Sequence, residues 1–515
     1  MGQSYNVAVI GAGTAGLVTA RELQREGHRV TVFEKANKVG GTWLYDSLVE
    51  SDLLGLDPNR EIVHSSLYKS LRTNLPRQVM GFLDYPFVKR ESGDTRPFPG
   101  HEEVLRFLQD FARDFGLMEL IRFGHEVIRV ELVDEVSHEW VVESRTRETE
   151  SRWESKEEVF EAVVICNGKN TEPKVAEFPG ISLMPLHQLS VTTTASKYMN
   201  IVSLCCSCWD TWPGLQMHSH NYRTPEQFEN KIVVLIGNGP SATDILREIS
   251  PLAKQVHLAF RGSDIMLINL KNYDNAWPHS PIDCAHEDGK VVFQDGSIVE
   301  ADVIIHCTGY KFHLPFLKSN GIVTVDDNRV GPLYKHIFPP SLAPWLSFVG
   351  LNYRVSFYLP FDQNVSWELN VTSEQEVAVS SPNAMSHPSE FCSNVSLIAK
   401  AFALVFRVME LQAIWVAKVL SGKVKLPTQE AMAASVEEFY EQMEKAGWPK
   451  YHTHSLQNDE GEYASWLAAQ SDIRPPKSWE EITFFSFVKG IFGHGENFRD
   501  TWDVDKWIQE IESSD

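Results

Sequence analysis

The sequence predicts an α/β fold with two parallel-sheet units, because the same local pattern occurs twice. A short apolar run over residues 6–10 leads into a glycine-rich turn, a helical pattern of apolar residues and a second apolar strand over 30–33. A run over 231–236 begins the same series again, and its second strand covers 255–260. Alternation of strand, helix and strand at this spacing is typical of a parallel sheet with helices packed against it. At 515 residues the chain is long enough for two or three domains.

The composition is that of a soluble globular protein, with 43% hydrophobic and 23% charged residues. The net charge of −22 disfavours phosphate backbones and anionic membranes, so we expect no nucleic-acid partner. The longest apolar stretch, about 397–420, contains four charged residues and predicts a core helix rather than a membrane span. We expect a cytoplasmic protein, because the N-terminal apolar run lacks the basic flank of a signal peptide and the seven cysteines do not suggest a disulfide framework.

The first glycine-rich turn has the complete fingerprint of a dinucleotide site. Its three glycines have separate tasks: the first permits a tight turn, the second lets the backbone approach a pyrophosphate, and the third lets helix and strand pack closely. The following helix points free N–H groups at the anion. A glutamate ends the second strand 18 residues past the last glycine, where its carboxylate can accept hydrogen bonds from ribose hydroxyls. The candidate residues are Gly11, Ala12, Gly13, Thr14, Ala15, Gly16 and Glu34.

The second turn repeats the fingerprint with the opposite charge after its strand. Arg261 lies 19 residues past Ala242, which occupies the tolerated third position of the turn. A carboxylate suits a bare ribose and an arginine suits a 2′-phosphate, so the first site is predicted to bind FAD and the second NADPH. Arg261 could instead be an ordinary solvated residue. The candidate residues of the turn are Gly237, Asn238, Gly239, Pro240, Ser241 and Ala242.

Five further segments have distinctive motifs. They are 35–43, which ends in Gly-Gly-Thr-Trp; 66–76, which ends in Thr-Asn-Leu-Pro; 80–87; 212–223, with the pattern W-x-G-x3-H-x3-Y; and 302–310, which ends in Thr-Gly-Tyr. Together they resemble the flavin-containing monooxygenases over nearly the whole chain, although Trp212 replaces the leading Phe of that family's motif. The amino-acid sequence of the 212–223 segment is most similar to that of the plant branch that S-oxygenates glucosinolates.

The resemblance implies a chemical scheme. NADPH reduces FAD, O₂ adds at flavin C4a, and the hydroperoxide oxygenates a soft sulfur or nitrogen atom, so the expected substrate is a small thioether or amine. It also implies that Asn74 is catalytic, since an amide both donates and accepts without supplying a strong acid. Asn74 could otherwise be a turn residue before Leu75-Pro76. The cofactor-contacting candidates that the resemblance adds are Lys35, Gly41, Thr42, Trp43, Thr73 and Asn74.

The resemblance further implies two Rossmann-like domains, with the NADPH domain inserted into the FAD domain. The FAD domain is expected to comprise 1–182 and 301–515, and the NADPH domain 212–300. The stretches 183–211 and 352–397 are much longer than the family's connections, and such long loops are uncommon in compact domains. We expect them to be insertions of the retained-intron type, translated in frame.

Several alternatives remain at this point. The chain could attack carbonyls as a Baeyer–Villiger or decarboxylating monooxygenase, or it could be a catalytically impaired relative. The CxxC spacing in 205–208 would suit a flavin disulfide reductase, but it lacks a helical context. His218 and His220 have no third ligand at sensible spacing, so no metal is expected. His218 and Tyr222 are four residues apart and could pair on one helix face, but we expect them to brace the entry to the NADPH domain. Lys169-Asn170 departs from the His-Tyr of many relatives.

Overall fold

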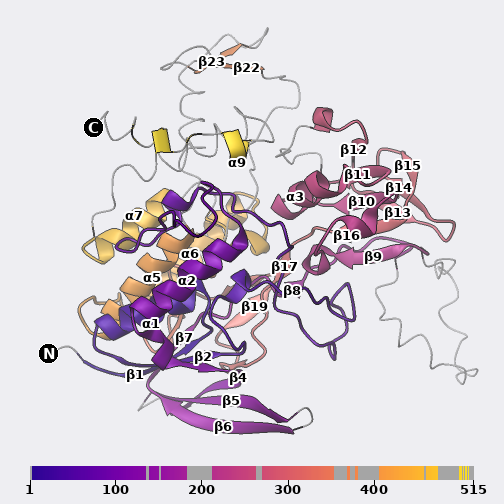
Figure 1. Cartoon of the computed structure of the whole chain (residues 1–515). Helices are drawn as coiled ribbons and strands as arrows, with labels where there is room; N and C mark the ends of the chain where they lie inside the picture. The colour runs from indigo at the N-terminus through magenta and orange to yellow at the C-terminus, as the bar shows by residue number, and fades with distance from the viewer. Residues whose placement is uncertain are drawn as a thin grey trace, which may run out of the picture.

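The computed structural model has two parallel-sheet units side by side, at the left and right of Figure 1, which confirms the predicted α/β fold class. The left unit combines strands that precede those of the right unit in the sequence with one strand that follows them, and the right unit comes from the middle of the chain. The residues that the structure describes are 3–134, 138–149, 152–181, 212–261, 270–352, 368–371, 377–380, 405–456, 460–473, 498–501, 503, 505–506 and 509.

The first sheet has the strand order β21-β7-β1-β2-β3, and all its neighbours are parallel. Its central strand is the apolar run that the sequence predicts, and it is almost wholly buried. Helices from both ends of the chain cover one face. The strands are β1 (Asn6–Ile10), β2 (Arg29–Glu34), β3 (Ile121–Phe123), β7 (Ala162–Ile165) and β21 (Leu346–Phe348), and the helices are α1 (Thr14–Arg25), α2 (His101–Asp114), α5 (Val405–Leu420), α6 (Gln429–Lys445) and α7 (Glu460–Gln470).

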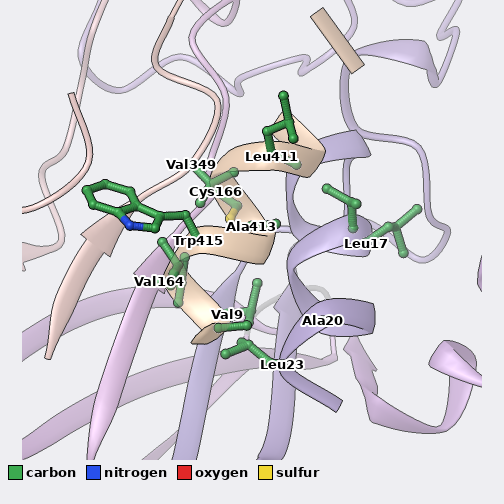
Figure 2. Close-up of a cluster of buried hydrophobic side chains, with 14 of the residues drawn as sticks. Val9, Leu17, Ala20, Leu23, Val164, Cys166, Val349, Leu411, Ala413 and Trp415 are labelled. Carbon is green, nitrogen blue, oxygen red and sulfur yellow. The ribbon is translucent and has the colours of Figure 1, made fainter. Parts of the chain in front are cut away.

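The contact between α1 and α5 joins the two ends of the chain. Figure 2 shows Leu17 and Ala20 of α1 near Leu411 and Ala413 of α5, in one cluster with side chains of β1 and β7. Small residues such as Ala20 and Ala413 allow the helix backbones to approach closely, and all of these side chains are fully buried. This packing fixes the start of α1, and with it the first glycine-rich turn.

The second sheet has the strand order β12-β11-β10-β16-β9, again with parallel neighbours. Its last strand in sequence ends at His306, so the sheet continues past residue 300, where the sequence suggested a boundary. The strands are β9 (Leu215–His218), β10 (Ile232–Ile236), β11 (Gln255–Ala259), β12 (Ala276–His279) and β16 (Val303–His306), with helix α3 (Pro240–Ile249) and the antiparallel set β13 (Ile282–Ala285), β14 (Lys290–Phe293) and β15 (Ile298–Glu300).

The remaining elements are the strands outside these sheets, among them the long strands β4, β5 and β6, together with 3₁₀ turns and one helical turn. They are β4 (Glu126–Asp134), β5 (Glu139–Thr149), β6 (Arg152–Phe160), β8 (Glu172–Pro173), β17 (Tyr310–Lys311), β18 (Leu317–Lys318), β19 (Thr324–Asp326), β20 (Arg329–Gly331), β22 (Glu368–Val371), β23 (Val377–Ser380), η1 (Gly41–Trp43), η2 (Arg77–Val79), η3 (Leu117–Leu120), η5 (Ser219–Asn221), η6 (Glu226–Phe228), η7 (Leu270–Asn272), η8 (Lys450–His452) and α9 (Phe498–Thr501).

Four sequence predictions concern stretches that lie partly or wholly outside the described residues. The CxxC segment and the expected insertion at 183–211 lie outside the described residues. In the second expected insertion, 352–397, the described parts beyond its first residue are β22 and β23, which pair as an antiparallel hairpin. The predicted core helix over 397–420 is described from residue 405. Within the described ranges, none of the helices combines the length and apolar character that a membrane crossing requires.

Candidate functional site: two dinucleotide turns and the segment between them

Two glycines of the first turn are required by the fold itself. Gly11 has φ +105°, and its N–H donates to the carbonyl of Phe33 at 2.8 Å. A Cβ at Gly11 would lie 2.7 Å from the carbonyl oxygen of Cys166, and a Cβ at Gly16 would lie 1.8 Å from the carbonyl oxygen of Gly11. Neither position can hold a side chain without moving backbone. The first and third glycines of the fingerprint therefore serve the tight turn and the close contact of helix and strand, as the sequence predicts.

The second glycine of this turn has a different surrounding. Gly13 has an ordinary backbone conformation, with φ −78° and ψ −171°, and as the N-cap of α1 it has no side chain that could accept a hydrogen bond from the first turn of the helix. The nearest described atom to a Cβ at Gly13 would be the Cα of Gly41, at 3.4 Å. Two glycine backbones thus face each other at the N-terminus of a helix, where N–H groups favour an anion. This cradle fits the pyrophosphate of a dinucleotide.

Glu34 lies at the carboxyl end of β2 and is buried beside the turn. Its carboxylate accepts hydrogen bonds from the backbone N–H groups of Ala12 and Ala36, each at 2.7 Å. Burial raises the pKa of the Glu34 carboxyl, although these N–H groups oppose that shift. A carboxylate has about four lone-pair sites, so the Glu34 carboxylate keeps acceptor capacity for a ribose hydroxyl. The neighbouring Lys35 instead forms an ion pair with Glu126 at 2.8 Å.

The second turn has nearly the same backbone geometry as the first. Gly237 has φ +115°, its N–H donates to the carbonyl of Ala259 at 2.9 Å, and a Cβ there would lie 2.6 Å from the carbonyl oxygen of Cys307. Gly239 caps α3 with φ −82°, and a Cβ at Gly239 would meet no described atom within 4 Å. Ala242, the third position, is fully buried. As far as the described residues extend, the space above Gly239 is open and fits a second dinucleotide.

The pairing of β1 with β2 and of β10 with β11 shows which residues at the ends of β2 and β11 are equivalent. Ile10 pairs with Phe33 and Ile236 with Ala259, so the residue equivalent to Glu34 is Phe260. Arg261 lies one residue farther along and corresponds to Lys35. The match in spacing that the sequence suggested between Glu34 and Arg261 is therefore off by one residue. Arg261 is exposed, and its guanidinium donates to the hydroxyl of Tyr451 at 3.4 Å.

Thr73 and Asn74 lie in the segment 66–76, called the Asn74 segment below, which contacts both units. The N–H of Thr73 donates to the carbonyl of Pro99 at 2.9 Å, and its hydroxyl donates to the carbonyl of Leu75 at 2.8 Å. The same segment is tied to α3, because the hydroxyl of Tyr68 donates to Asp244 at 2.6 Å. Asn74 itself is exposed, and its side-chain oxygen accepts a hydrogen bond from Arg499 of α9.

The aromatic and hydroxyl candidates after Gly41 lie in the short helix η1. Trp43 packs edge-on against Phe406 at the start of α5, with ring centroids 6.3 Å apart, whereas Thr42 is exposed. Gly41 has φ +54°, which favours glycine, and a Cβ there would come within 2.9 Å of the Cα of Gly13. This packing holds η1 against the first turn.

His218, His220 and Tyr222 are buried and have structural partners. His220 Nδ1 lies 2.9 Å from the hydroxyl of Ser66, and the hydroxyl of Tyr222 donates to Glu248 of α3 at 2.6 Å. Burial lowers the pKa of His218 to about 3. His218 ends a strand and Tyr222 follows a 3₁₀ turn, so the two do not share a helix face. Over the described ranges, no group of three or more His, Cys, Asp or Glu side chains could hold a metal ion.

Sequence reasoning missed three residues at this site, Asp244, Glu248 and Arg499. Asp244 and Glu248 lie one turn apart on α3 and accept hydrogen bonds from the segment that contains Asn74. Their spacing of four on a helix that follows a fingerprint is a sequence signal, since it places both carboxylates on one face. Arg499 also contacts this face, but nothing in its local sequence indicates that.

Comparison with known proteins agrees with this geometry. A family model described as flavin-binding monooxygenase-like matches residues 4–190, 191–282 and 279–387. The flavin-containing monooxygenase FMO GS-OX-like 3 of Arabidopsis thaliana is 43% identical over 512 residues, covering 99% of this chain and 96% of the relative. FMO GS-OX5 of the same plant is 44% identical, with coverages of 98% and 94%.

A solved structure extends the comparison to three dimensions. The S-allyl-L-cysteine S-oxygenase from Allium sativum superposes with a TM-score of 0.79 at 42% identity, covering 99% of this chain and 98% of that one. The resemblance that the motifs predicted is confirmed over the full length, including the dependence on FAD and NADPH. The chain belongs to the flavin-binding monooxygenase-like family and is an FAD-dependent monooxygenase.

Proposed function

We propose that this monooxygenase uses NADPH and O₂ to oxygenate a soft nucleophile in a small molecule, with thioether sulfur preferred to amine nitrogen. The observation that supports sulfur is the full-length similarity to an enzyme described as acting on S-allyl-L-cysteine, together with GS-OX relatives at similar identity. When bound, FAD supplies the ring that accepts a hydride and then activates O₂. The protein's tasks are to bind, to orient and to exclude water.

We assign FAD to the first turn and NADPH to the second. The Gly13–Gly41 cradle and the N-terminus of α1 would hold the FAD pyrophosphate, and Glu34 its ribose. The open N-terminus of α3 at Gly239 would hold the NADPH pyrophosphate. The sheet order supports an NADPH domain inserted into the FAD domain, since β9 to β16 lie in sequence between β7 and β21.

Asn74 is proposed to hold the activated oxygen near the flavin. Its carboxamide is exposed, and its segment is anchored at one side to the FAD unit through Thr73 and at the other to α3 through Tyr68. A residue whose segment contacts both units is well placed to act where hydride donor and flavin meet. The amide can donate to oxygen without the acidity that would release it as peroxide.

A substrate panel tests the proposed function. The purified protein is supplied with NADPH, O₂ and one of four compounds: S-allyl-L-cysteine, a tertiary amine, a cyclic ketone or a small disulfide. We expect the S-oxide to form fastest and NADPH consumption to follow it. Lactone formation as the main activity would favour carbonyl attack, thiol formation would favour disulfide reduction, and FAD binding without turnover would identify an impaired relative.

Arg261 is proposed to recognise the 2′-phosphate of NADPH. It is exposed just past the end of β11, and its described contact with the hydroxyl of Tyr451 is long, at 3.4 Å. A charge-assisted hydrogen bond contributes about 1.5–3 kcal/mol, so Arg261→Ala should raise the KM for NADPH about tenfold to a hundredfold and leave that for NADH nearly unchanged.

Lys254 offers a matched control. It is exposed at the opposite end of the same strand, so Lys254→Ala removes an equal charge far from the proposed phosphate site. This variant should keep the wild-type ratio of the two KM values. Equal losses for NADPH and NADH in Arg261→Ala would show that the arginine has a structural role only.

A further inference from the structure

The helical turn α9 lies against the Asn74 segment although it is far away in the sequence (Figure 1). The guanidinium of Arg72 donates to the carboxylate of Asp500 at 2.7 Å and to the carbonyl of Arg499 at 3.2 Å. A little farther on, the side-chain amide of Gln78 donates to Asp505 at 2.6 Å. Backbone and side-chain contacts together therefore dock this part of the chain beside Asn74.

Arg499 is the residue of α9 that reaches the site. Its guanidinium donates to the side-chain oxygen of Asn74 and to the carboxylate of Asp244, the latter at 3.2 Å. Its side chain is only 14% exposed, which is unusual for arginine and shows that the charge is enclosed between these partners. One planar group thus joins the Asn74 segment, α3 and α9.

The contact between the Arg499 guanidinium and the Asn74 carboxamide fixes the orientation of the amide. A guanidinium has five N–H donors and no acceptor, so the end of the Asn74 carboxamide that faces it must be the oxygen. The NH₂ end of the carboxamide is then directed away from the guanidinium and is available to another acceptor. Without Arg499 the carboxamide could rotate and present either end. We infer that Arg499 is a positioning residue, which holds the Asn74 amide with its N–H donors available to the oxygen at the flavin; this rests on the proposed role of Asn74.

Asp244 shows that this role is separate from holding α3 in place. Its carboxylate also accepts hydrogen bonds from the hydroxyl of Tyr68 at 2.6 Å and from the guanidinium of Arg247 at 2.7 Å. Loss of Arg499 therefore leaves Asp244 with two partners and α3 with its link to the Asn74 segment. Loss of Arg499 should therefore affect oxygen transfer to the substrate, which depends on the orientation of the Asn74 amide, more than FAD binding or flavin reduction.

Arg499→Met, which keeps the length of the aliphatic chain, tests the inference. With S-allyl-L-cysteine, the S-oxide formed per NADPH should fall about tenfold, the usual effect of one charge-assisted hydrogen bond, and H₂O₂ should account for the difference. FAD content and the rate at which NADPH bleaches the oxidised flavin should be unchanged. Arg499→Lys should recover part of the yield, because an ammonium can donate to the amide oxygen but lacks the planar fork that spans both partners.

Two further variants distinguish an error in the positioning role of Arg499 from an error in the proposed role of Asn74. Asp505→Asn weakens the docking of the same chain segment at Gln78 and Lys89, away from Asn74, and should leave the yield unchanged. In an Asn74→Leu background, Arg499→Met should add no further loss. If Asn74→Leu lowers the yield but Arg499→Met does not, or if their losses add, the positioning role is wrong. If Asn74→Leu itself has no effect, the proposed role of Asn74 is wrong, and the inference from Arg499 is overturned with it.

Discussion

Replacing Gly13 with valine is expected to give a folded protein that purifies without the yellow colour of FAD. The backbone of Gly13 has a conformation that any residue adopts, and the nearest described atom to a new Cβ is 3.4 Å away, at Gly41. The apoprotein should therefore accept the change. The two valine methyls, however, would occupy the cradle where the backbone N–H groups at the start of α1 meet the pyrophosphate. Flavin absorbance per protein, with circular dichroism to check folding, measures the effect.

The second turn supplies a reciprocal variant. Gly239 has nearly the same backbone angles, and a Cβ there would meet no described atom within 4 Å. Gly239→Val should remain yellow but should no longer be reduced by NADPH, while dithionite should still reduce its flavin. Full FAD occupancy in Gly13→Val, or loss of FAD in Gly239→Val, would contradict the assignment of the two sites.

Replacing Asn74 with leucine is expected to separate NADPH oxidation from product formation. Leucine has a similar volume but no hydrogen-bonding group, and the side chain is exposed, so FAD should stay bound and NADPH should still reduce it. Loss of one preorganised donor in a reaction centre commonly costs about a hundredfold or more in rate. The S-oxide yield should fall by that order, and H₂O₂ released per NADPH consumed should approach one.

Asn74→Asp distinguishes donation by the amide from simple support of the loop. An ionised aspartate still accepts the hydrogen bond from Arg499, but it has no N–H donors. We expect it to release H₂O₂ as Asn74→Leu does. A normal S-oxide yield in Asn74→Asp would mean that the segment needs only its contact with Arg499. Normal yields in both variants would leave Asn74 as a turn residue.

The dinucleotide turns could be predicted from the sequence because their determinants are local. Gly11 and Gly237 need positive φ, Gly16 needs contact with the preceding strand, and each requirement lies within one strand–turn–helix unit. Arg261 shows the limit of counting residues. The counts of 18 and 19 residues already differ by one, and the strand register shows what this difference means: the position equivalent to Glu34 is Phe260, and Arg261 lies one residue beyond it.

The network around Asn74 could not be predicted, because its partners are distant in sequence. Arg499 is 425 residues from Asn74 and 255 from Asp244, and no periodicity links such positions. His218 and Tyr222 illustrate a related difficulty. Their spacing of four suggested a helix face, but the segment is a strand followed by a 3₁₀ turn, and tertiary contacts with Ser66 and Glu248 surround it. Local spacing in the sequence predicts candidate site residues, but only the tertiary structure shows their hydrogen-bond partners.

Oxygen labelling of the thioether product tests the proposed function most directly. The thioether arm of the substrate panel would be run under ¹⁸O₂ in unlabelled water, and the S-oxide would be analysed by mass spectrometry alongside NADPH consumption. A monooxygenase that acts on sulfur should place one ¹⁸O atom in each S-oxide and consume one NADPH per product, with the second oxygen atom leaving as water. S-oxide that contains oxygen from the solvent, or labelled S-oxide that also forms without NADPH consumption, would contradict the account.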